Sequence, residues 1–301
     1  MRLFILSRSA ALYSTNSLLQ AARRANHQVT VVDHTRCNLL LDQRQAKIYY
    51  GGTKLTMPDA VVPRIGASVT DVGVRVIQQF EARKVFSAVR SDALSQARDK
   101  LRSLQILLKA DVPVPRSYFL HDLEDLPAAI EALNGPPVII KLLESTHGAG
   151  VILAESETTA VSVAEAFIRN KQPVLLQEYI RESRGEDIRA FVVGGKIVAA
   201  MRRKAATGEF RSNLHRGAEG SIAQLSQAEE RMALRAAKVL RLGIAGVDIL
   251  RSARGPLVIE VNASPGLEGI EHYTQVDVAG HVIRHVEERF KHWRTQLFSQ
   301  P

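Results

Sequence analysis

The sequence has little cysteine, few aromatic residues and no long apolar run, and each shortage excludes a class of protein. A single cysteine, Cys37, in 301 residues cannot form an intrachain disulfide and is typical of a reducing compartment. Aromatic residues make up 5% of the chain, and none of them alternate with basic residues as in single-strand nucleic-acid binders. No run approaches the length of a transmembrane helix, and residues 1–8 lack the pattern of a signal peptide. We therefore expect a cytoplasmic protein without a membrane anchor.

The chain is basic and of ordinary hydrophobicity. Forty Lys and Arg residues against 31 Asp and Glu residues give a formal net charge of +9. Such a charge attracts nucleic acid, a ribonucleoprotein or an acidic substrate, although a generally basic surface has the same composition. With 301 residues, 46% of them hydrophobic, the chain can bury a core divided between two or three domains.

The first 90 residues alternate between short β-branched runs and amphipathic stretches, which predicts a small parallel α/β domain. The predicted strands are 3–6, 29–32 and 59–66, and the predicted helices are 17–25 and 72–83. Arg64 falls at the carboxyl end of the third strand, where open α/β sheets bind ligands. It is a candidate to hold either a substrate carboxylate or a neighbouring acid. Residues 92–110 have helical spacing and end at a Pro-containing segment.

Two β-rich runs near the C-terminus, 247–252 and 256–261, flank a short turn that ends in Gly255. If Ser252 pairs with Pro256, then Asp248 lies opposite Glu260, and Asn262 points to the same face. Two like charges directly opposite each other destabilise a sheet, so the pattern predicts a neutralising cation. Carboxylate and amide oxygens favour Mg²⁺ or Mn²⁺ shared with substrate phosphates. The alternative is a pair of solvated surface acids.

A lone lysine and a Gly-rich turn suggest where such phosphates bind. Lys141 interrupts an aliphatic strand, 136–143, and should face an anion because a buried ammonium is costly unless it is paired. Residues 145–151 follow with the sequence STHGAGV, whose backbone N–H groups can bind phosphate. The turn matches neither the Rossmann nor the P-loop glycine pattern, and His147 within it has the default interpretation of a solvated loop residue.

Further polar residues lie between this lysine and the acidic hairpin. Glu178 and Tyr179 end a strand over 173–180, Asp187 and Arg189 alternate on the next, and Gly194-Gly195 predicts a hairpin. A basic and amide cluster follows: Arg202, Arg203, Lys204, Arg211, Asn213, His215 and Arg216. Such a cluster is usually a solvated face, but its place in the chain favours contacts with phosphate or carboxylate. Ser226 and Glu229 form a capping box for a helix over 226–242.

Taken in order, these segments resemble the ATP-grasp ligases, and most closely the RimK-type ribosomal protein S-six:glutamate ligases. The resemblance covers nearly the whole chain, and its segments are 5–8, 63–66, 97–103, 210–217 and 255–271. It implies an α/β and α+β architecture, in which a Rossmann-like pre-ATP-grasp domain precedes a two-subdomain ATP-grasp fold. We expect the pre-ATP-grasp domain over 1–92, a lid subdomain with its connecting helix over 93–176, and the metal-binding and catalytic subdomain over 177–301.

The resemblance also assigns roles to single residues. Lys141 is similar to the lysine that binds the ATP phosphates, Glu178 and Tyr179 to the adenine-side hinge, and Asp187 to the ribose-side acid. The residues similar to the phosphate-covering loop are Arg211, Ser212 and Asn213, and the implied catalytic residues are Lys141, Arg211 and Asn213. The residues that match the metal ligands are Asp248, Glu260 and Asn262, for two Mg²⁺ or Mn²⁺ ions.

The implied activity is ATP-dependent amide-bond formation through an acyl phosphate. The implied substrates are free L-glutamate and the acidic C-terminal tail of a ribosomal protein, with contact to the ribosome, and we expect a homo-oligomer. The tail suits the basic charge of the chain. Two alternatives remain open: an ATP-grasp ligase for another carrier protein or small peptide, of the lysine-biosynthetic, cofactor-glutamylating or glutathione-forming kind, or a ribosome- or RNA-binding module with a vestigial ATP site.

Overall fold

The computed structural model describes the backbone of residues 1–42, 46–143, 150–214 and 217–298. Its N-terminal region contains the predicted parallel sheet, in the order β2-β1-β6-β7. These strands are β1 (Arg2–Leu6), β2 (Gln28–Val32), β6 (Ala60–Pro63) and β7 (Phe86–Ser87). The helices that follow β1 and β6 are α1 (Tyr13–Arg24) and α2 (Thr70–Ala82). The predicted alternation of strands and helices is confirmed, with bounds that differ by a few residues.

A small antiparallel sheet in this region was not predicted. It consists of β3 (Cys37–Leu40), β4 (Lys47–Tyr50) and β5 (Thr53–Lys54). Gly51 and Gly52 make the β4–β5 turn with φ values of 58° and 78°. Two consecutive glycines between β-formers are a hairpin signal, because a two-residue turn of this hand needs positive φ at both positions.

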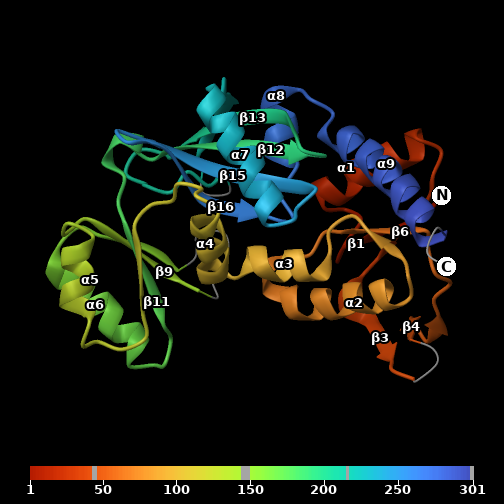
Figure 1. The fold of residues 1–301 in the computed structure, drawn as a ribbon, viewed down its shortest axis with the longest axis horizontal. Coiled ribbons are helices and arrows are strands. Elements are labelled where there is room, and N and C mark those ends of the chain that lie inside the picture. Colours follow the sequence, from red (N-terminus) through yellow and green to blue (C-terminus); the bar gives the residue numbers. More distant parts are fainter. Residues whose placement is uncertain (43–45, 144–149, 215–216, 299–301) are drawn as a thin grey trace.

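The predicted helix over 92–110 is two helices. They are α3 (Ser91–Arg98) and α4 (Lys100–Lys109). Asp99 lies between them, and its extended backbone interrupts the helix. The Asp99 side chain accepts a hydrogen bond from the backbone N–H of Arg102, so it caps α4. The break at Asp99 separates Arg98 from Lys100, and α4 lies between α3 and the lid (Figure 1).

The lid is an antiparallel sheet in the order β10-β9-β11-β8, covered by α5 (Leu126–Ala132) and α6 (Glu157–Ile168). Its strands are β8 (Ser117–Leu120), β9 (Val138–Leu142), β10 (Val151–Ala154) and β11 (Val174–Glu178). The buried residues of the lid form a hydrophobic cluster separate from that of the rest of the chain. Lid and body are therefore separate packing units. We predicted that the lid subdomain ends at position 176, but strand β11 continues past that position. Our division of the chain into domains remains a proposal.

The third sheet is antiparallel, in the order β14-β13-β12-β15-β16. Its strands are β12 (Glu186–Val193), β13 (Lys196–Lys204), β14 (Glu219–Ile222), β15 (Ile244–Ser252) and β16 (Gly255–Asn262). α7 (Gln227–Val239) begins with the predicted capping box, and Gly194-Gly195 makes the predicted β12–β13 turn. The core of this sheet is continuous with that of the N-terminal region, so the two pack as one body.

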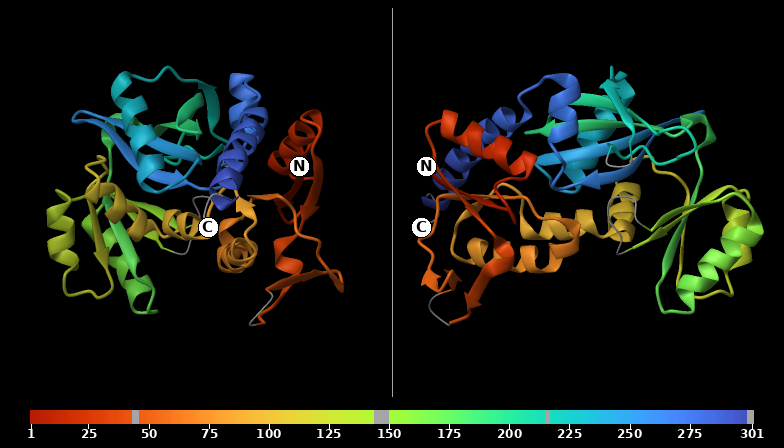
Figure 2. Two further views of the ribbon diagram at one scale, coloured as in Figure 1. Left: turned by 45° about the vertical axis from the view of Figure 1, so that its right-hand side comes forward. Right: turned by 180° about the vertical axis from the view of Figure 1, so that it is seen from behind.

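Two helices near the C-terminus were not predicted: α8 (Glu268–Thr274) and α9 (Val278–Phe298). α9 lies beside α1 (Figure 1 and the right-hand view of Figure 2). Across this contact Arg24 pairs with Asp277, and His27 pairs with Glu287. These helices therefore join the third sheet to the N-terminal region. Among the described residues, no helix is both long and apolar enough to cross a membrane.

Candidate active site

The acidic hairpin has the predicted pairing at its centre but not at its turn. Ser252 pairs with Gly255 rather than Pro256, which leaves a two-residue loop. A bulge on β16 at Ile259 then adds one residue, so that Asp248 does lie opposite Glu260. The predicted turn is wrong and the predicted acidic pair is confirmed, because the bulge makes up the difference. Bulges occur preferentially next to active sites, where they redirect a side chain.

Asp248 already has a counter-charge from protein side chains. Both carboxylate oxygens accept hydrogen bonds from Arg189, at 2.7 Å from Nε and 2.6 Å from Nη2, and Arg203 Nη2 lies 3.0 Å from Oδ2. The Asp248 side chain is 4% exposed and that of Arg189 is 16% exposed. We predicted from sequence that a cation neutralises this pair; the structure shows two arginines in that role for Asp248.

Asp187 belongs to the same network. It faces Arg203 across β12 and β13, and both of its oxygens accept hydrogen bonds from that guanidinium. Burial raises the pKa of Asp187, while for Asp248 the two arginines outweigh burial and lower the pKa. Burial lowers the pKa of Arg203, but the facing Asp248 and Asp187 carboxylates raise it on balance. The ribose role of Asp187 stays a prediction, and in this structure its carboxylate binds Arg203.

Glu260 is exposed and faces cations. Its charge raises the pKa values of Lys141, Arg98 and Lys100 against the lowering effect of their burial. Lys141 donates a hydrogen bond of 2.6 Å to Gln177 Oε1 on the adjacent strand β11. Burial, with the charge of Lys100 adding to it, lowers the pKa of Lys141 to about 8. The charge of the hairpin carboxylate therefore acts on the lid lysine, and the roles assigned to the two residues stay predictions.

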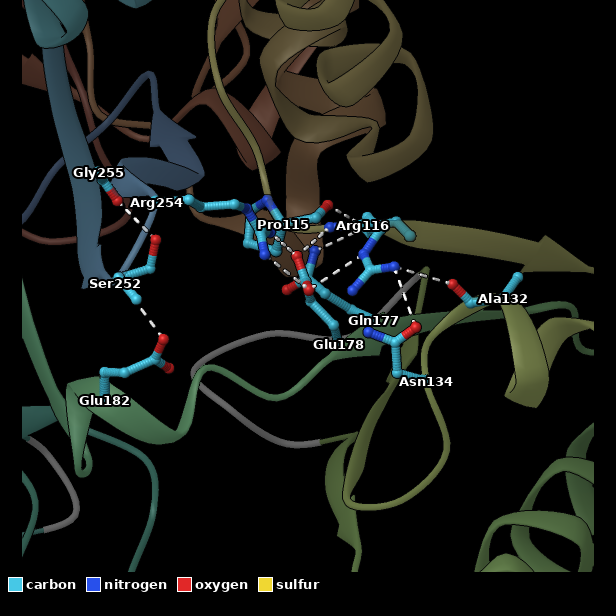
Figure 3. A network of polar contacts seen from close by, with 12 residues as sticks. Pro115, Arg116, Ala132, Asn134, Gln177, Glu178, Glu182, Ser252, Arg254 and Gly255 are labelled. Atoms are coloured by element: carbon cyan, nitrogen blue, oxygen red, sulfur yellow. Dashed lines mark hydrogen bonds and ion pairs between the residues drawn. The ribbon is translucent and has the colours of Figure 1, made fainter.

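Glu178 lies at the junction of lid and body, as Figure 3 shows. Its carboxylate accepts hydrogen bonds from the backbone N–H of Arg116, at 2.6 Å, and from the Arg116 and Arg254 guanidinium groups. Burial raises the pKa of Glu178, but these contacts, Arg254 first, lower it below the usual value on balance. Arg254 is at the tip of the β15–β16 hairpin, so the side chain of Glu178 ties the lid strand to the acidic hairpin. Tyr179 follows it and is half-buried.

The basic loop reaches the lid. Arg211 pairs with Glu209, at 2.7 Å between Nη2 and Oε2, and its Nη1 lies 3.4 Å from the carbonyl oxygen of Val151 on β10. Ser212 and Asn213 follow in a half-buried segment. His147, Gly148 and Ala149 of the Gly-rich turn lie outside the described residues, as do His215 and Arg216 of the basic cluster.

Within the described part of the chain, Arg64 forms no ion pair with an acid. Its Nη2 donates to the carbonyl oxygen of Pro265 at 2.7 Å, in the segment that follows β16. Sequence reasoning missed three residues at this site: Arg98, Lys100 and Arg189. Arg189 lies two residues from Asp187 on one strand, so both side chains are on the same face. This spacing could have indicated that Arg189 supplies positive charge to the acidic site. Arg98 and Lys100 lie in segment 97–103, which carries part of the family resemblance, but the single helix predicted over 92–110 gave no reason to place them at the site.

The residues present suit a hard divalent ion. Glu260 offers an exposed carboxylate, and Asn262 lies on the same face, with its Nδ2 3.5 Å from Asp248 Oδ2. Because amide O and N are assigned from the hydrogen-bond network, the opposite flip would point an oxygen there. Within the described parts of the chain, no group of three or more His, Cys, Asp or Glu side chains is arranged to hold a metal. A site here therefore needs the amide of Asn262 and oxygens from a phosphate as well.

Comparisons with known proteins agree with this geometry. Residues 1–94 match the RimK PreATP-grasp domain, and residues 97–286 match the RimK-like ATP-grasp domain. The chain is 50% identical over 296 residues to a "Probable alpha-L-glutamate ligase" of Thioalkalivibrio sulfidiphilus, covering 98% of each chain. It is 51% identical over 288 residues to the protein of the same name in Pseudomonas fluorescens, covering 96% of each.

A solved structure gives independent support for the fold. The ATP-grasp ligase PsnB, complexed with minimal precursor, Mg and ADP, superposes with a TM-score of 0.74 at 22% identity, over 96% of this chain and 98% of that one. The predicted pre-ATP-grasp and ATP-grasp architecture is thereby confirmed. The protein is an ATP-grasp enzyme and belongs to the RimK-like family.

Proposed function

We propose that the protein is an ATP-dependent ligase that joins L-glutamate to a carboxyl group. Two relatives of about half-identical sequence carry the name of a glutamate ligase. The observation that carries the proposal is the convergence of Lys141 from the lid, Glu260 from the hairpin and Arg211 from the basic loop. Such an arrangement can bind a polyphosphate and a carboxylate side by side.

The reaction proceeds in two steps. A carboxylate oxygen of the acceptor attacks the γ-phosphorus of ATP, which forms an acyl phosphate and releases ADP. The amine of glutamate then attacks the acyl carbon, loses a proton, and expels inorganic phosphate. Anions meet in both steps, so rate enhancement requires preorganised positive charge. Lys141 on β9 and Arg211, which contacts the neighbouring strand β10, would supply it.

The remaining family residues hold the nucleotide and its metal. Glu178 and Tyr179 would border the adenine and Asp187 the ribose, while Ser212 and Asn213 would lie over the phosphates. Glu260 and Asn262, with Asp248, would hold one or two Mg²⁺ or Mn²⁺ ions. Bound ions of this kind neutralise phosphate oxygens as charge develops. Because the carboxylate of Asp248 already binds two arginines, Glu260 and Asn262 are the more available ligands.

The proposed acceptor is the C-terminal carboxylate of ribosomal protein S-six. The net charge of +9 supports an acidic polypeptide tail, because opposite charge speeds encounter. The test is intact-mass analysis of S-six from the same source after incubation with ATP and glutamate. A ladder of glutamate additions supports the proposal. A ladder with lysine in place of glutamate, or additions only to another carrier protein, would instead identify one of the related ligase activities.

A further inference from the structure

Two arginines lie where the N-terminal sheet meets the end of the acidic hairpin. Arg64 directly follows β6 at the carboxyl edge of the parallel sheet, and Arg98 is the last residue of α3. Arg64 binds the Pro265 carbonyl beyond β16, while Arg98 Nη2 donates to the Ile65 carbonyl at 2.7 Å. Backbone contacts therefore hold both guanidinium groups in place, Arg98 acts electrostatically on Arg64, and Glu260 acts on Arg98.

The two arginines lack the partners that buried cations usually have. Over the described ranges, neither guanidinium lies within ion-pair distance of a carboxylate. The Nε of Arg98 and the hydroxyl oxygen of Ser264 are both buried without a hydrogen-bond partner there. Ser264 is two residues beyond Asn262, between the proposed metal ligands and the Pro265 carbonyl that Arg64 binds. Buried donors of this kind are rare unless a ligand satisfies them.

The electrostatics of the pair also favour a bound anion. Burial lowers the pKa of Arg64 to about 10, and the charge of Arg98 adds to that effect. Burial lowers the pKa of Arg98, and among the described residues the opposing charge is that of Glu260, which also acts on Lys100 and Lys141. One carboxylate is thus shared among several cations. Buried charges are normally paired, so this region lacks negative charge that a substrate can supply.

We infer that Arg64, Arg98 and Ser264 form a binding site for the carboxylate of a glutamate unit. A planar guanidinium suits a carboxylate because its two N–H groups match the two oxygens. The site adjoins Glu260 through Arg98, so a substrate carboxylate held there would lie beside the proposed metal ligands. The inference rests on the proposed ligase function. The glutamate unit is either the free amino acid or the last residue of the acceptor.

Variants that remove the charge test this site. Arg64→Gln and Arg98→Gln each replace the guanidinium with a shorter, neutral amide that still carries N–H donors. Arg98→Lys keeps the charge and loses the planar fork. Arg75→Gln is the matched control, because Arg75 is an exposed arginine of α2 that pairs with Asp71 on its own helix. Melting temperatures establish which variants remain folded, and Arg98→Lys serves where a glutamine variant does not fold.

Kinetics then separate the two sources of the carboxylate. KM is measured for glutamate at saturating acceptor and for acceptor at saturating glutamate, and ATP affinity is measured by nucleotide titration. We expect one KM to rise about ten- to hundredfold, the range for losing a charged hydrogen-bond partner, with ATP affinity unchanged. A rise for glutamate identifies the free amino acid, and a rise for the acceptor identifies its terminal residue. Arg98→Lys should recover part of the loss.

Two results would overturn the site. Unchanged KM values for both substrates would show that the arginines serve packing alone, and an equal loss of ATP affinity would assign them to the nucleotide phosphates. Calorimetric titration of glutamate and of acceptor peptide into protein saturated with a non-hydrolysable ATP analogue measures the site without turnover. If the wild-type protein binds these ligands but adds no glutamate, the proposed function fails while the binding site stands.

Discussion

Replacing Asp248 and Glu260 separately should give the same loss of activity but different losses of stability. Both lie on one face of the hairpin, and each is proposed to hold the metal, so Asp248→Asn and Glu260→Gln should both abolish ligation. Asp248 differs in its surroundings, because its buried carboxylate neutralises Arg189 and Arg203. Glu260 is exposed, so water screens its charge.

The magnitude follows from which charges remain unpaired. Removing one partner of a buried ion pair typically costs about 3–5 kcal/mol. The lower figure applies here, because Arg203 keeps Asp187 and Arg189 is partly exposed. An unfolding entropy of about 2 cal/mol/K per residue over a chain of this size converts roughly 3 kcal/mol into a fall of about 5 °C in melting temperature. An exposed charge is worth less than about 1 kcal/mol, or about 2 °C.

The assay is calorimetric or fluorescence melting in buffer with a chelator, so that no metal contributes. The transition to follow is that of the body, because the lid has a separate core and can melt independently. Equal melting temperatures for the two variants would refute the structural role of Asp248. A larger fall for Glu260→Gln would refute the assignment of Glu260 as an exposed ligand.

Four further outcomes are expected. Lys141→Met, which keeps the apolar stem, should fold normally and lose ATP turnover; wild-type turnover would remove Lys141 from the site. Because the pKa of Lys141 is lowered to about 8 and bound phosphate should raise it, ATP binding at pH above about 8 should take up protons. Calorimetry in buffers of different ionisation enthalpy measures this uptake, and its persistence in Lys141→Met would contradict it. Arg254→Ala should weaken ATP binding severalfold with little change in melting temperature, because the pair with Glu178 joins hinge and hairpin; unchanged affinity would show that the pair has no effect on the nucleotide. The rate at subsaturating acceptor should fall as salt screens the basic charge over roughly 10 Å at 0.1 M, and a salt-independent rate would argue against electrostatic attraction of the tail.

The sequence predicts the parts of this protein that follow from local periodicity. The parallel α/β region, the β12–β13 turn and the capping box of α7 all carry signals within a few residues of each other, and the structure contains them. The Asp248–Glu260 pair was also foreseen, although a bulge rather than the turn sets its register.

The parts that were missed depend on contacts between distant segments. Arg98 and Lys100 come under the charge of Glu260 because α3 and α4 pack near β16, which is distant in the sequence. The binding of Asp248 by Arg189 and Arg203 requires the order of strands in the third sheet, which no local pattern gives. Sequence alone therefore predicted the pairing of Asp248 with Glu260 but not the two arginines that bind Asp248, and the metal role of these residues stays a prediction.

The central claim is that the acceptor's terminal carboxylate is activated by ATP and then joined to glutamate. It is tested most directly by labelling that carboxylate with oxygen-eighteen and analysing the inorganic phosphate released in a reaction with ATP and glutamate. Because the attacking carboxylate oxygen stays on phosphorus when the amine displaces it, one labelled oxygen should appear in phosphate for each glutamate added in a first turnover. Unlabelled phosphate alongside a mass increase of the acceptor would contradict activation of the C-terminal carboxylate.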